Sequence, residues 1–192
     1  MTRRFTREEL SRFVGATVPD LVGDLSPRLV VVGINPGLWT AATGTHFAHP
    51  SNRFYPALHA AGITDRQLDR VAGLTDHDRA LLTGRGIAIT NLVARATARA
   101  SELSAEELRA GAEALVVRLS AWQPRVVAIA GVTAYRTAFR RPRAQLGVQE
   151  EHLAGAELWV VPNPSGLNAH ETTATLAVAY RKVAVAAGVL VG

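Results

Sequence analysis

The sequence predicts a single α/β domain in which a central parallel sheet of four strands is covered by helices on both faces. Short, continuous apolar runs, typical of strands buried on both sides, recur along the chain. Segments with helical spacing of apolar residues separate these runs, and strands that alternate with helices form parallel sheets. A chain of 192 residues is long enough for one domain with a complete core.

The first half of the chain is predicted to contain two of the strands. Residues 28–34 form a continuous apolar run, and Gly62 stands where it would end a helix. The segment between them is polar and aromatic, and so long a loop in a compact domain usually has a function. The predicted elements are, in order, an N-terminal extension of helix and loop over 1–27, a strand over 28–34, an irregular loop over 35–53, a helix over 53–62, one or two short helices over 64–82 and a strand over 87–93.

The second half is predicted to complete the sheet. Ser104 and Glu107 have the spacing of a capping box, which opens a helix with an apolar face. The predicted elements are, in order, a helix over 105–122, a strand over 125–130, a short helix ending at Phe139, an irregular segment over 140–156 that can include a hairpin arm, a strand over 158–162 and a closing helix over 171–187.

The composition excludes several classes of protein. With 48% hydrophobic and 19% charged residues, the chain has the balance of a globular domain, and no apolar run reaches the ~18 residues that span a bilayer. The absence of cysteine excludes disulfides, thiol catalysis and cysteine-bound zinc. The N-terminal residues lack the apolar segment of a secretion signal, so we expect a cytoplasmic protein that is associated with the nucleoid.

The charge pattern is more informative than the net charge of +5. Acidic residues are absent from 25–64, 79–101 and 158–170, and these windows contain the ends of three predicted strands. A cleft without carboxylates suits a phosphate backbone, although sixteen acids can also cluster by chance. The basic residues that remain in the windows are Arg28, Arg53, Arg79, Arg85, Arg95 and Arg99.

An asparagine stands at the end of each of these strands. They are Asn35, Asn91 and Asn163, and sites in open α/β sheets form outside the carboxyl ends of strands. The chemistry of such a site is restricted, because the predicted cleft offers no carboxylate pair, no cysteine and no lysine. His46 and His49 have no acidic partner for a metal, so we expect neither a metal nor an organic cofactor. An amide can still hold and orient a water molecule.

Four motifs together give the chain a family resemblance. They are GINPG at 33–37, TGTHFAHPSNRF at 43–54, NLV at 91–93 and NPSGL at 163–167. In this combination the chain resembles the mismatch-specific (G·U/T) branch of the uracil-DNA glycosylase superfamily, from about Arg28 to Arg181. A base that leaves easily suits an uncharged site, because the departing uracil can carry the negative charge.

The resemblance implies roles for residues at matching positions. Asn35 would orient the hydrolytic water, Phe47 would stack on the extruded base unless it is a core or lid residue, and Leu167 would be a wedge in the duplex unless it only starts a helix. Thr40 would contact a phosphate or cap its own loop, and Asn163 would brace the loop or touch the base. The full set of implied site residues is Gly33, Ile34, Asn35, Phe47, Asn91 and Asn163 for the catalytic and base pocket, and Thr40, Ser165, Gly166, Leu167 and Asn168 for the wedge and the phosphates.

Three positions depart from the family pattern. Asn91 replaces a lysine of the best-known members, Ala94 replaces an acid of some relatives, and Ala169 replaces a basic residue after the wedge. We therefore expect Asn91 to bind the edge of uracil and to broaden activity beyond G·U. We also expect Asn35 to act without an auxiliary base, and the grip on the opposite strand to be weaker.

The sequence thus predicts a monofunctional DNA glycosylase, acting as a monomer. It would remove uracil, and related damaged bases, from mismatched double-stranded DNA and leave an abasic site for base excision repair. Two alternatives remain open on the same scaffold: a non-catalytic binder of mismatched or abasic DNA, and a hydrolase of free nucleosides or nucleotides.

Overall fold

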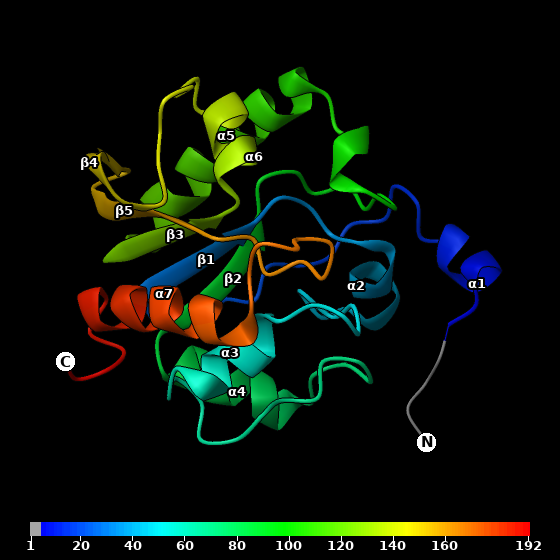
Figure 1. Cartoon of the computed structure of the whole chain (residues 1–192), viewed down its shortest axis with the longest axis horizontal. Coiled ribbons are helices and arrows are strands. Elements are labelled where there is room, and N and C mark those ends of the chain that lie inside the picture. Colours follow the sequence, from blue (N-terminus) through cyan, green and yellow to red (C-terminus); the bar gives the residue numbers. More distant parts are fainter. Residues whose placement is uncertain (1–4) are drawn as a thin grey trace.

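The computed structural model describes residues 5–192, and it folds them around one sheet (Figure 1). The elements in chain order are α1 (Arg7–Ser11), β1 (Leu29–Gly33), α2 (Leu38–Thr43), α3 (Phe54–Ala60), α4 (Asp76–Gly84), β2 (Ile87–Asn91), the 3-10 turn η1 (Ala100–Glu102), α5 (Ala105–Trp122), β3 (Val126–Ala130), α6 (Val132–Ala138), β4 (Gly147–Leu153), β5 (Ala156–Val161) and α7 (Thr173–Ala186). No helix within residues 5–192 is long and apolar enough to cross a membrane.

The sheet has five strands, so the prediction of four was wrong. Their order is β2-β1-β3-β5-β4, with β4 antiparallel to β5 and the other pairs parallel. The extra strand is the hairpin arm of the 140–156 segment. Its sequence, GVQEEHL, is mostly polar, and its side chains alternate between half-buried and exposed because it is an edge strand. The continuous apolar run that revealed the central strands is therefore missing there.

The central strands are apolar throughout because both faces of the sheet are covered. In β1, Leu29 and Val31 pack against one cluster of helices, and Val30 and Val32 pack against the other. Helices α3, α4 and α7 cover the first face, and α5 and α6 cover the second (Figure 1). This arrangement confirms the predicted helices on both faces.

Helix starts agree with the capping signals, while one short helix was missed. The Ser104 hydroxyl accepts the Glu107 amide hydrogen at the start of α5, as its spacing predicted.

Helix α2 lies inside the segment predicted as an irregular loop over 35–53. It has only six residues and begins after Gly37 without a side-chain cap, so the sequence carries little signal for it.

Helix α5 lies directly on the backbone that follows β2. A Cβ atom at Gly111 would lie 2.5 Å from the carbonyl oxygen of Leu92 and 2.9 Å from its carbonyl carbon. Glycine is therefore required for this close approach, and it sets the distance between α5 and the carboxyl end of β2.

We expect Gly111→Ala to lower the free energy of unfolding by about 1–3 kcal/mol, because the added methyl group must push α5 away from the sheet. Gly84→Ala is the matched control: Gly84 is an exposed helical glycine with open space around it, so alanine should raise stability by about 0.4–1 kcal/mol. Urea denaturation measures both changes. An unchanged midpoint for Gly111→Ala would show that the helix moves aside without cost.

Candidate active site

The parallel strands bring the three predicted asparagines to one edge of the sheet. Gly33, the last residue of β1, lies opposite Asn91, the last residue of β2. Asn35 follows the end of β1 by two residues, and Asn163 follows the end of β5 by two. Because the carboxyl ends of parallel strands share an edge, these four residues lie at the same edge of the sheet.

Asn35 is held in a single orientation by its own neighbours. Its Nδ2 donates to Thr97 Oγ1 (2.7 Å), to the Arg95 carbonyl oxygen (3.0 Å) and to the Pro36 carbonyl oxygen (3.2 Å). Main-chain carbonyls can only accept, so the amide nitrogen must face them. No group within residues 5–192 donates to Oδ1 of Asn35, which leaves this oxygen free to accept a hydrogen bond from water.

Gly33 is covered by two of the predicted pocket residues. A Cβ atom there would collide with Asn91 Oδ1 and would lie 3.3 Å from the Phe47 ring. The Phe47 backbone has φ 55°, a left-handed conformation that non-glycine residues adopt rarely. Its ring packs on Phe54 with 4.3 Å between ring centroids, so the side chain is supported from one side. Asn91 and Phe47 therefore both lie against Gly33.

The Asn91 amide has a buried partner that the sequence did not indicate. Asn91 Nδ2 lies 3.1 Å from Nδ1 of His46, and His46 Nε2 lies 3.0 Å from the Pro19 carbonyl oxygen. Burial lowers the pKa of His46 below its usual value, so the ring is neutral at pH 7. The main chain of Asn91 is also held, because Arg118 Nη2 donates to its carbonyl oxygen (2.9 Å).

Backbone contacts tie the turn after β1 to the segment after β2. The carbonyl oxygens of Gly33 and Ile34 accept the amide hydrogens of Leu92 (2.9 Å) and Val93 (3.0 Å). These carbonyls therefore already have partners on the side of β2. The predicted backbone contacts of Gly33 and Ile34 with a base edge must use their remaining hydrogen-bonding capacity.

The 163–168 loop is braced from within by side-chain contacts to its own backbone. Asn163 Oδ1 accepts the Ser165 amide hydrogen (3.0 Å), Ser165 Oγ accepts that of Leu167 (3.3 Å), and Asn168 Nδ2 donates to the Asn163 carbonyl oxygen (3.0 Å). The loop ends well before α7, so Leu167 does not start a helix. Its side chain is 87% exposed at the tip of this rigid loop.

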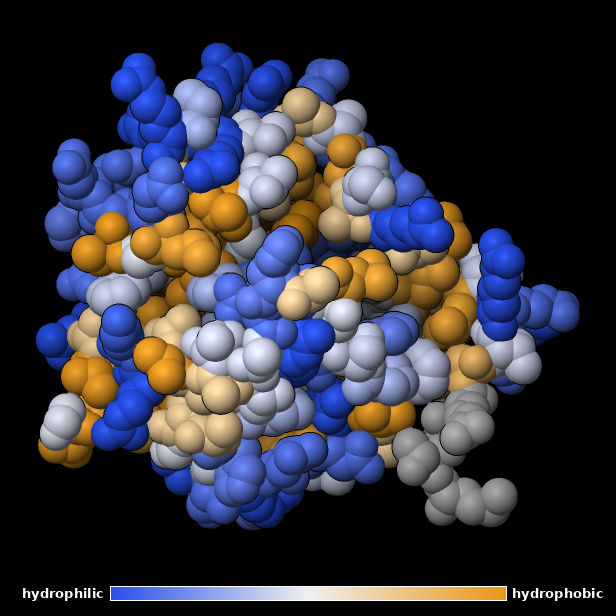
Figure 2. Space-filling model, viewed as in Figure 1, coloured by the Kyte–Doolittle hydropathy of each residue, from blue (hydrophilic) through white to orange (hydrophobic). Residues whose placement is uncertain are grey.

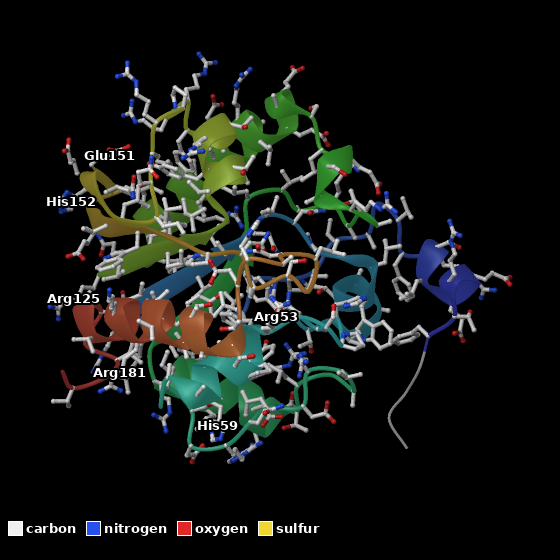
Figure 3. All side chains as sticks on the ribbon, in the orientation of Figure 1. Arg53, His59, Arg125, Glu151, His152 and Arg181 are labelled. Atoms are coloured by element: carbon white, nitrogen blue, oxygen red, sulfur yellow. The ribbon has the colours of Figure 1, made fainter. Side chains whose placement is uncertain are left out.

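Arg53 fastens the 163–168 loop to the start of α3. Its amide donates to the Pro164 carbonyl oxygen (2.9 Å), and its Nη1 donates to those of Asn168 (3.1 Å) and Ser165 (3.4 Å). Figure 3 shows Arg53 beside this loop, while Arg125 lies at the opposite end of the strands. A Cβ atom at Gly166 would collide with Ser51, so the two loops touch directly.

Three residues predicted to contact phosphates make hydrogen bonds within their own loops, and for Thr40 the structure favours the loop-capping alternative. Thr40 is only 5% exposed, and its hydroxyl accepts the Ala48 amide hydrogen (3.4 Å), so it caps its own loop. The Ser165 amide is bonded to Asn163, and both ends of the Asn168 side chain are used within the loop. These contacts shape the loop, and a phosphate contact by Ser165 or Asn168 stays a prediction that would use the Ser165 hydroxyl hydrogen or the second hydrogen of Asn168 Nδ2.

The arginines of the acid-free windows also differ from the prediction. Arg28 and Arg85 precede β1 and β2 and so lie at the far, amino edge of the sheet. Arg79 donates to the Gly44 carbonyl oxygen (3.1 Å), and Arg95 pairs with Glu107. With Arg53 engaged in the loop, Arg99 is the one of the six that stays exposed beside the site.

A hollow of about 530 Å³ opens next to the strand ends, between α1 and α2. Figure 2 shows apolar side chains at the right of the molecule, in the region where Figure 1 labels α1 and α2. The hollow is lined by Arg7, Leu10, Ser11, Val14, Gly37, Leu38, Trp39, His49 and Ala98. Among residues 5–192, no cluster of three histidine or acidic side chains could hold a metal ion.

Several positioning residues were missed at the level of the sequence. His46 was considered as a metal ligand and set aside, and no role was given to Thr97 or Arg118. Arg53 was assigned to phosphate contacts. Each of these side chains acts through a contact with a residue distant in sequence, so only the fold could reveal it.

Comparison with known proteins gives a consistent result. The model of the uracil DNA glycosylase superfamily matches residues 19–184. The fold is similar to the solution NMR structure of a protein from Methanosarcina acetivorans that is provisionally assigned as a uracil DNA glycosylase, with a TM-score of 0.59 and 16% sequence identity. The similarity covers 88% of this chain and 98% of that chain. At this identity it shows a shared fold.

We expect Gly166→Ala to loosen the 163–168 loop, because its Cβ would lie 2.5 Å from Ser51 Cβ and 2.8 Å from the Ser51 carbonyl oxygen. Amide exchange in this loop should become faster, and stability should fall by about 1–3 kcal/mol. Ser51→Gly in the same chain removes the side chain of Ser51 and should restore part of the protection. Equal exchange in wild type and Gly166→Ala would contradict the close packing of the loops.

Proposed function

The chain belongs to the uracil DNA glycosylase superfamily, and we propose that it is a monofunctional, mismatch-specific member. In this proposal it acts as a monomer on double-stranded DNA, extrudes uracil or a related damaged base and hydrolyses the glycosidic bond. The products are the free base and an abasic site. The proposal rests above all on the anchored amide of Asn35.

Asn35 supports a water-orienting role because its nitrogen is fully engaged and its oxygen is free. A water molecule that donates to Oδ1 would be held at the carboxyl edge of the sheet, near the C1′ atom of an extruded nucleotide. The C1′–N1 bond breaks first, and its electrons pass to the base. The water then forms the new C1′–O bond and loses its proton to solvent. An amide cannot take that proton, so the good leaving group carries the reaction.

Phe47 and Asn91 support the choice of a pyrimidine such as uracil. The Phe47 ring lies against Gly33 and offers a face on which an extruded base can stack. Asn91 Oδ1 lies on the same side, as an acceptor without a protein donor within residues 5–192. The N3–H group of uracil is the donor that fits it.

Leu167 supports a duplex as the substrate rather than a free nucleoside. A large apolar side chain that is 87% exposed on a braced loop is suited to insertion between base steps. A hydrolase of small nucleosides would gain nothing from it. Extrusion costs least at a mismatch, which favours mismatched pairs without any contact to the opposite base. Arg99 is placed to contact the phosphate backbone, so binding should weaken with salt.

We expect Asn35→Ala to lower single-turnover cleavage of a G·U duplex by about 10²-fold or more, because the water loses its fixed position. Binding to a duplex with an abasic-site analogue should change little, since Asn35 is not a phosphate contact. Labelled oligonucleotides, excess protein and alkaline strand cleavage give the rate. Unimpaired cleavage would remove Asn35 from the mechanism, and no cleavage by the wild type would favour a non-catalytic binder.

We expect Leu167→Ala to reduce excision from duplex DNA by about 10-fold, because the vacated stack is no longer filled. Uracil in single-stranded DNA needs no extrusion from a stack, so its excision should be nearly unchanged. Leu25→Ala is the matched control, a leucine that is 85% exposed and precedes β1 at the opposite edge of the sheet. Equal loss on both substrates would contradict the wedge role.

A further inference from the structure

We propose that His46 is a positioning residue that fixes the orientation of the Asn91 amide and thereby makes the pocket select bases with an N3–H donor. The inference rests on the proposed function and adds to it the residue that sets base selectivity. It is carried by a chain of two hydrogen bonds that runs from Pro19 through His46 to Asn91.

The first hydrogen bond fixes the tautomer of His46. The Pro19 carbonyl oxygen, 3.0 Å from Nε2, can only accept, so Nε2 must carry the hydrogen. In the neutral ring Nδ1 then has a lone pair and no hydrogen. His46 is 3% exposed, and a flipped ring would turn carbon atoms toward both partners, so the two hydrogen bonds fix its orientation.

The second hydrogen bond transfers this choice to Asn91. An Nδ1 lone pair at 3.1 Å requires a donor, and the only donor of the amide is Nδ2. Asn91 Oδ1 therefore points away from His46 and over Gly33, where a Cβ atom would collide with it. The reversed amide would set two lone pairs against each other inside the protein.

The orientation of Asn91 decides which base edge is accepted. Uracil and thymine carry N3–H and can donate to Oδ1, whereas N3 of cytosine carries a lone pair and would face the oxygen unpaired. When a site is built around one buried hydrogen bond, an analogue that cannot form this bond reacts many-fold more slowly. His46 would thus act on selectivity without touching the substrate.

The N-terminal segment holds this chain of contacts in place. Leu21 pairs with Ile89 of β2 through two hydrogen bonds of 2.9 Å and 2.8 Å, which fixes Pro19 beside the sheet. The Asn91 main chain is held by Arg118. Both ends of the chain of contacts are thus anchored to β2, so His46 has rigid partners.

Protonation of His46 would break the arrangement, because Nδ1 would then donate and would attract Oδ1. Burial lowers the pKa of His46, so the neutral ring persists below the usual histidine range. The charged groups that act on the ring are Asp20, which opposes this shift, and Arg79, which adds to it. Selectivity should be complete at neutral pH and should be lost as the pH falls through the pKa of folded His46.

The test compares excision of 5-fluorouracil and 5-fluorocytosine opposite guanine, a pair in which the 5-substituent is the same. In wild type we expect a strong preference for 5-fluorouracil, and in His46→Phe we expect the ratio of the two rates to fall at least about 10-fold. His46→Gln retains an acceptor and should restore most of the ratio. A merely structural role would slow both substrates equally and leave the ratio unchanged, which would overturn the inference.

The pH profile of the same ratio provides a second measurement that does not depend on how His46→Phe folds. The wild-type ratio should fall at acid pH and the His46→Gln ratio should not. Burial also lowers the pKa of His49, whose ring bonds to Ser51 and makes no hydrogen bond to Asn91, so His49→Gln is the matched control and should keep the wild-type fall. A ratio that is flat with pH in wild type would contradict the inference. No excision of 5-fluorouracil by wild type would instead refute the proposed function.

Discussion

The structure depends on hydrogen bonds that give each asparagine of the site one orientation. Asn35 donates through its amide nitrogen to carbonyl oxygens and leaves its amide oxygen free. Asn91 likewise donates through its amide nitrogen to His46 and leaves its oxygen free. In Asn163 the amide oxygen is the engaged group, because it accepts a hydrogen bond from the Ser165 amide of its own loop. A side-chain amide has a donor and an acceptor of similar shape, so its neighbours decide which of the two faces the site. Each amide therefore presents one fixed group to the site.

Several arginines of this chain hold irregular backbone. Arg53 and Arg79 donate to carbonyl oxygens of loops at the carboxyl edge, and Arg70 donates to that of Pro50 (2.6 Å). Loop carbonyls have no ladder partners, and partly buried ones need a donor. A long side chain with five donors can reach several of them. The positive net charge of the sequence thus overstates how many arginines can meet DNA.

Much of the fold was readable from the sequence, because the signals were local. The run Leu29–Gly33 and the capping pair Ser104 and Glu107 identify their elements without help from the rest of the chain. Strand β4 and helix α2 are stabilised by tertiary contacts, and their own residues show neither a continuous apolar run nor a side-chain cap. The number of strands was therefore underestimated.

The sequence predicted the asparagines of the candidate site but not the residues that form hydrogen bonds with them. Asn35, Asn91 and Asn163 stand at strand ends, and strand ends can be read from hydrophobic patterns. The partners of these amides come from distant segments, so spacing along the chain cannot reveal them. Thr40 shows the converse error, because a hydroxyl near a glycine-rich turn resembles a phosphate ligand until its burial is known.

The pairing of Leu21 with Ile89 makes the amino-terminal segment part of the site. This segment contributes no named strand to the sheet, but it carries the carbonyl of Pro19 that accepts from His46. Without that carbonyl, nothing would fix the hydrogen on Nε2 of His46, and the ring could exchange tautomers. The same segment supplies Leu21 to the hydrophobic core and Asp20 to the ion pair with Arg118, so one stretch of chain contributes both to stability and to the orientation of the amide that faces the base.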